Sequence, residues 1–136
     1  MTMSGPMTLF ELGQRAMSAQ LVRMNAAASN LANAGSVAAS EEEAYRPLRA
    51  VFAEQLDAAT GMSTVNVSEV QRADVAPVRR HEPGHPLADA EGYVWASPVD
   101  ENAEMVEMLE ASRQYQNMVE ALSTAKQLML ETMRMK

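Results

Sequence analysis

The last third of the chain, residues 101–136, reads ENAEMVEMLEASRQYQNMVEALSTAKQLMLETMRMK. No Pro or Gly interrupts this stretch and good helix formers fill it, which predicts one long helix with Ser97 and Pro98, or Asp100, at its start. Such a helix is about 52 Å long and needs a packing partner along most of its length. Its residues recur in alternating steps of three and four, the spacing of a coiled-coil seam: Met105, Met108, Ser112, Tyr115, Val119, Leu122, Lys126, Met129 and Met133.

The start of the chain shows the same spacing and predicts a second long helix. Its seam positions are Met7, Phe10, Gln14, Met17, Leu21, Met24, Ala28 and Leu31. Thr8 with Glu11 reads as a capping box, Met7 with Leu12 as a hydrophobic staple, and the residues up to Gly35 as the stop.

Between the two helices the pattern supports only short strands. Residues 65–70, 75–78 and 93–95 have the composition of strands, whereas residues 45–56 are of uncertain class and contain Pro47. We therefore predict a mainly α fold in which long N- and C-terminal helices form a coiled-coil layer, with a small β-containing middle segment. The predicted division is residues 1–36, 37–97 and 98–136.

Composition narrows the possible functions. Of the 136 residues, 47% are apolar but only 4% aromatic, and the 12 Met residues favour adaptable helix packing. The net charge is −7 and no basic stripe is present, which makes nucleic acid an unsuitable partner. There is no Cys and no unbroken apolar run, so we expect neither a disulfide framework, a cleaved secretory signal nor a membrane span, and we expect no cofactor.

One short motif suggests a metal site. His81, Glu82 and His85 match the letters of the zinc-protease motif H-E-x-x-H, which works only on a helix. Pro83 and Gly84 occupy the interior of that helical turn, where proline costs about 3 kcal/mol. The stretch therefore reads better as a turn, and a zinc hydrolase using both His residues is kept as a minor alternative.

Three stretches resemble one known family. Residues 28–34, ASNLANA, resemble the N-terminal signature of the bacterial flagellar axial proteins of the rod and hook. Residues 104–106, 111–116 and 119–120 resemble the C-terminal element of the proximal rod members of that family. A turn element of the same members is matched by Pro83, Gly84, Pro86, Leu87, Asp89, Gly92 and Tyr93.

The resemblance implies a structural protein and not an enzyme. It implies a subunit of the flagellar basal-body rod that passes through the flagellar type III export apparatus without a cleaved signal. In the periplasm it would polymerise with other rod proteins and neighbouring copies into the proximal part of the torque-transmitting drive shaft. A cytoplasmic coiled-coil adaptor would use the same helices and stays open as an alternative.

We expect the terminal helices to be unable to satisfy their apolar seams within one copy. Small residues and amides on the first helix suit either a close, dry interface or a fraying, Asn-capped helix end. The predicted assembly residues are Met17, Leu21, Met24, Asn25, Asn30, Leu31, Asn33, Met105, Met108, Tyr115, Val119, Leu122 and Met129.

Overall fold

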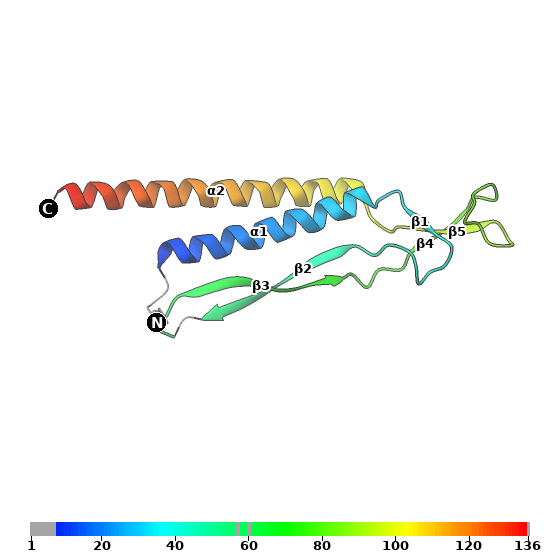
Figure 1. Cartoon of the computed structure of the whole chain (residues 1–136), viewed down its shortest axis with the longest axis horizontal. Coiled ribbons are helices and arrows are strands. Elements are labelled where there is room, and N and C mark those ends of the chain that lie inside the picture. Colours follow the sequence, from blue (N-terminus) through cyan, green and yellow to red (C-terminus); the bar gives the residue numbers. More distant parts are fainter. Residues whose placement is uncertain (1–7, 57, 60, 136) are drawn as a thin grey trace.

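The chain folds into two long helices and five strands that form an elongated molecule (Figure 1). The computed structural model describes residues 8–56, 58–59 and 61–135. The elements in order are α1 (Leu9–Ala32), β1 (Val37–Ala38), β2 (Leu48–Leu56), β3 (Ser63–Arg72), β4 (Val78–His81), β5 (Tyr93–Ala96) and α2 (Glu101–Arg134). The helices lie side by side and run in opposite directions, the β2–β3 hairpin lies along α1, and the other strands gather beyond the end of α1 (Figure 1).

Helix α1 begins and ends where the sequence predicts, and α2 begins at one of the two predicted starts. Thr8 caps α1, its Oγ1 accepting a hydrogen bond of 3.1 Å from the Glu11 N–H, and Asn33 is the C-cap. Asp100, rather than Ser97, caps α2 by accepting from the backbone N–H groups of the next turn. The predicted staple involves Met7, which lies outside the described residues.

Small residues let the two helices approach closely. Gly13 of α1 is buried against α2, and a Cβ placed there would lie 2.6 Å from Cδ2 of Leu122. The buried apolar residues are few and mostly small: Ala19, Ala26, Ala27, Ala44, Val94, Ala96 and Ala111. The interior is therefore thin, and most of the large apolar side chains lie at least partly exposed.

The prediction of a mainly α fold with a small β-containing middle is wrong, because the fold is α+β. The strands β2 and β3 hold 9 and 10 residues and pair antiparallel from Leu48↔Arg72 to Leu56↔Ser63, with a bulge at Val51/Phe52. A two-stranded hairpin is marginal by itself, and this one is supported because α1 packs along it. Local pattern left residues 45–56 unassigned because that support comes from a distant segment.

A second, three-stranded sheet has the order β1-β5-β4. Its central strand contains the buried Val94 and Ala96 and agrees with the predicted strand at residues 93–95. The strand predicted at residues 75–78 instead begins at Val78 and continues to His81, paired with β5. Pro77 has no N–H for the ladder, so pairing starts after it.

Candidate assembly surface

An ion-pair cluster joins α1 to α2 near the middle of their contact. The guanidinium of Arg23 donates to both carboxylate oxygens of Glu107, one of them at 3.1 Å, and lies 3.5 Å from Glu110. The hydrogen bonds from Arg23, opposed by burial, hold the pKa of Glu107 below its ordinary value, and the same bonds raise the pKa of Arg23. The cluster therefore links the two helices at this point along their contact.

Acidification is expected to remove the stability that this cluster provides. Because the pKa of folded Glu107 is lowered, its contribution is present above the ordinary value of 4.5 and is lost as the pH falls through the lowered folded value. Glu107 is partly exposed, so the contribution at neutral pH is about 1 kcal/mol or less. Urea unfolding of wild type and Glu107→Gln should differ at pH 7 and converge in strong acid; a difference that grows on acidification would contradict the assignment.

Asn30 ties the C-terminal part of α1 to the start of the hairpin. Its side chain is 0% exposed, its Nδ2 donates to the Leu48 carbonyl at 3.0 Å, and its Oδ1 accepts from the Leu48 N–H at 2.7 Å. The same Oδ1 accepts from the Tyr45 hydroxyl at 2.8 Å, and that hydroxyl also bonds Ser29. The amide therefore bonds both backbone groups of Leu48, and its hydrogen bonds are made within one copy.

A buried carboxylate ties the start of α2 to the same hairpin. Glu104 is 1% exposed and forms an ion pair with Arg49 of β2, while its Oε2 has no hydrogen-bond partner. A carboxylate in the first turn of a helix is favoured by the helix dipole. Glu104 and Asn30 together hold α1, α2 and β2 at one junction.

The face of α2 that α1 covers differs from the predicted seam. Glu104 and Ala111 are buried, and Met108, Tyr115 and Leu122, spaced by seven residues, are half-buried. Of the other predicted α2 positions, Met105, Val119 and Met129 are exposed. On α1, Met17, Met24, Leu31 and Asn33 are half-buried, Asn30 is buried, and Leu21 and Asn25 are exposed.

An apolar strip of α2 remains uncovered beside the contact with α1. It contains Met105, Val106 and Leu109, of which Leu109 is 67% exposed. Val106 and Leu109 also line a shallow depression with Arg113. Sequence reasoning missed Val106 and Leu109 because a strict seam repeat leaves no place for them.

The last turns of α2 extend past the start of α1 (Figure 1). Leu122 lies against Gly13, only four residues after α1 begins at Leu9, and a small apolar cavity of about 310 Å³ lies at this point. We call residues 127–134 the overhang. Its exposed apolar residues are Leu128, Met129, Leu130 and Met133, the last at 68% exposure.

The motif around the two His residues is a turn, as predicted. It connects β4 to β5, with the Glu82 N–H donating to the Gly92 carbonyl at 2.8 Å. Gly92 has φ +85 and Asp89 accepts from the Glu91 and Tyr93 N–H groups, both at 2.9 Å. These bonds, that from Tyr93 above all, lower the pKa of Asp89.

The family turn residues Asp89, Gly92 and Tyr93 therefore shape the loop between β4 and β5. Within the residues that the structure describes, no group of three or more His, Cys, Asp or Glu side chains is arranged to hold a metal ion. Neither described helix is long and apolar enough to cross a membrane.

Comparison with known proteins matches both ends of the chain to flagellar families. Residues 10–36 match the family described as flagella basal body rod protein, and residues 90–135 match flagellar basal body rod FlgEFG protein C-terminal. The flagellar basal-body rod protein FlgC of Salmonella typhimurium is 44% identical over 93% of this chain and 95% of that protein. FlgC of Yersinia enterocolitica is 45% identical over the same shares, and FlgC of Agrobacterium fabrum is 31% identical over 83% of this chain and 82% of its own length.

Paired terminal helices with an uncovered apolar strip, together with these matches, define a structural protein of the flagellar basal-body rod. The resemblance visible in the sequence is thereby confirmed. The chain belongs to the FlgC family of these rod proteins. Neither the coiled-coil adaptor nor the zinc hydrolase gains support from the matches.

Proposed function

We propose that this chain, as a non-catalytic subunit, builds the proximal part of the rod by packing its terminal helices against neighbouring subunits. The neighbours are copies of itself and other rod proteins. The observation that carries the proposal is the overhang, where the apolar face of α2 continues beyond α1 and is left exposed. Exposed apolar surface of this kind marks an interaction site.

The geometry of α2 favours a helix as the occupant of the overhang. Met129 lies seven residues after Leu122, which lies seven after Tyr115, so all three share one face of α2. Over the first part of α2 this face packs against α1. A neighbouring subunit that supplies a similar helix with small residues would extend the same packing along the overhang.

The proposed rod function also implies where the subunit is located and how it is exported. We place the subunit in the periplasmic part of the basal body, reached through the flagellar type III export apparatus in an unfolded state without cleavage of a signal. The thin, alanine-rich interior supports this route, because little buried apolar area opposes unfolding. No contact with nucleic acid is proposed, in keeping with the net charge of −7.

Quantitative mass spectrometry of purified basal bodies tests the proposal. Cells lacking this chain should be non-motile and should yield basal bodies without a completed rod, and re-expression should restore both. The chain should be present in restored basal bodies in a fixed ratio to other rod proteins. Normal basal bodies in the deletion strain, with the chain recovered as a stable cytoplasmic oligomer, would instead support the adaptor.

A further inference from the structure

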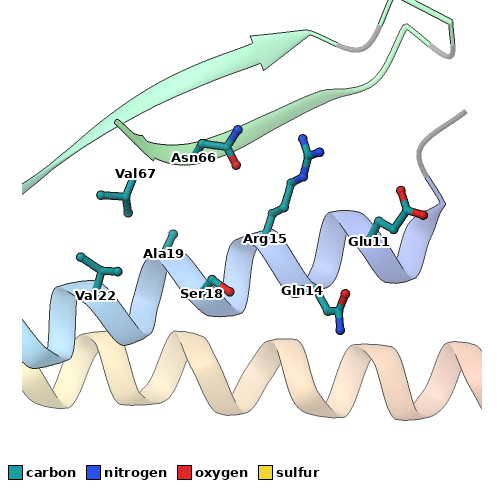
Figure 2. Close-up of a pocket in the computed structure, with 8 residues that line it drawn as sticks. All are labelled: Glu11, Gln14, Arg15, Ser18, Ala19, Val22, Asn66 and Val67. Carbon is teal, nitrogen blue, oxygen red and sulfur yellow. The ribbon is translucent and has the colours of Figure 1, made fainter. Parts of the chain in front are cut away.

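A groove runs between α1 and β3 (Figure 2). It has a volume of about 760 Å³, and the residues lining it include Glu11, Arg15 and Ser18 of α1 and Asn66 of β3. In Figure 2 the side chain of Arg15 extends from α1 toward β3, close to Asn66. Among the described residues that line the groove, Arg15 is therefore the only cationic one, and it lies between the helix and the hairpin.

Arg15 is half-buried, and part of its guanidinium is left without a partner. Its Nη1 is buried without a hydrogen-bond acceptor, and Arg15 forms no ion pair with any residue that the structure describes. Glu11 lines the same groove but lies beyond ion-pair distance. Arg23, on the same helix, has Glu107 and Glu110 as partners. A buried donor nitrogen without an acceptor is costly, and a charge-assisted bond to a carboxylate is the strongest way to satisfy it, so a carboxylate from outside this copy is the expected partner of Arg15.

We propose that Arg15 receives a carboxylate from the acidic turn, residues 41–43, of a second copy of this chain. This inference rests on the proposed packing of neighbouring copies in the rod. Glu41, Glu42 and Glu43 are exposed and form no ion pair within the described part of the chain. Glu42 lies beside Arg46 and Arg72 in a shallow pocket, which leaves Glu41 and Glu43 as the better placed partners.

The contact can form only between two copies. Arg15 precedes the end of α1 at Ala32 by 17 residues, a distance of about 26 Å along the helix, and the acidic turn lies beyond that end. With the two copies parallel, the second copy is therefore displaced by about 26 Å along the long axis, toward the start of α1. That displacement also sets its helices beside the overhang of the first copy. Between parallel copies such a contact joins two different surfaces head to tail, so it repeats along a filament, whereas copies related by a two-fold axis could close it into a dimer.

Disulfide trapping tests the contact directly, because the chain contains no Cys of its own. We expect Ser18→Cys combined with Glu42→Cys to give dimers and higher oligomers in basal bodies treated with mild oxidant. A bond within one copy is ruled out because the two Cα atoms lie much farther apart than the roughly 7 Å limit. Ser18→Cys with Asp74→Cys, another exposed acidic position, is the matched control and should remain monomeric.

Charge reversal then identifies the interaction. In the trapping background, Arg15→Glu should lower the cross-linked fraction about tenfold, and adding Glu41→Arg with Glu43→Arg should restore it. Arg15→Lys should keep most of the cross-linking. Circular dichroism of the isolated variants verifies that each is folded. The double variant Glu41→Gln, Glu43→Gln leaves the groove intact and should lower cross-linking as Arg15→Glu does.

Specific results would overturn the inference. Three outcomes would each reject the acidic turn as the partner. The first is unchanged cross-linking in both Arg15→Glu and the Glu41→Gln, Glu43→Gln pair. The others are equal cross-linking in the Asp74 control and disulfides formed to a different protein. If Arg15→Glu enters the rod in wild-type amounts with full motility, the proposed Arg15 contact is rejected while the proposed rod function is retained. If the wild-type chain is missing from basal bodies, the proposed function itself fails.

Discussion

Aspartate at both Met129 and Met133 is expected to stop this chain from entering the rod while leaving the isolated chain folded. Both side chains are exposed on the overhang, so the substitutions disturb little within one copy. In an assembled rod the same positions would be buried, and each unpaired carboxylate would cost several kcal/mol. Loss of motility, basal bodies without this chain and an unchanged urea midpoint are the expected measurements.

A second pair on the same helix provides the control. Thr124→Asp with Gln127→Asp adds the same two charges at exposed positions on the opposite side of α2. This protein should enter rods and support motility at close to wild-type levels. If the Met129 and Met133 variant assembles as well as the control, the overhang is not an assembly surface. Equal failure of both variants would point to sensitivity to charge along the whole helix.

Removing the Asn30 side chain is expected to give the largest loss of stability of any single substitution considered. Asn30→Ala leaves the Leu48 N–H without a partner. It also removes one of the two hydrogen bonds to the Leu48 carbonyl, the other coming from Arg49, and one of the two made by the Tyr45 hydroxyl, which keeps Ser29. An unsatisfied N–H costs about 1–3 kcal/mol, partly relieved by water, and the two other lost hydrogen bonds add smaller amounts, so the free energy of unfolding should fall by about 2 kcal/mol. Urea unfolding measures the loss, and hydrogen exchange at the Leu48 amide should accelerate.

Two further substitutions, Asn25→Ala and Asn30→Asp, serve as comparisons for Asn30→Ala. Asn25 is exposed on the same helix, so Asn25→Ala should change the free energy of unfolding by no more than about 0.5 kcal/mol. Asn30→Asp keeps the shape but replaces the donor that faces the Leu48 carbonyl with an oxygen, and it should be nearly as damaging as Asn30→Ala. A wild-type urea midpoint for Asn30→Ala would show that the junction does not depend on this amide.

The helices illustrate what local pattern predicts well. Thr8 and Asn33 cap α1 and Asp100 caps α2. Caps can be predicted from sequence because a capping side chain bonds backbone groups within one turn of itself. The turn before β5 is equally local, since Gly92 and Asp89 form it through nearby backbone groups. Features of this kind are visible in one sequence because the residues that form the contacts are close along the chain.

The seam on α2 illustrates where pattern reasoning stops. A three-and-four repeat identifies an apolar face, but Met105 and Val119 are exposed whereas Glu104 and Ala111 are buried. The covered face is set by α1, whose Gly13 allows close approach at Leu122 and whose Arg23 selects Glu107. The burial of Glu104 cannot be predicted without knowing that Arg49 of β2 lies opposite it and forms an ion pair with it.

The sequence by itself determined both long helices, the caps of α1, the turn before the last strand and the family, and it narrowed the cap of α2 to two candidates. Only the tertiary structure decided that residues 48–56 and 63–72 pair as a long hairpin along α1, that Asn30 forms its hydrogen bonds inside one copy and that α2 overhangs α1. Hydrogen bonds and caps within a few residues are encoded locally. The strands of the hairpin, the orientation of α2 and the exposed overhang depend on packing between segments that are far apart along the chain.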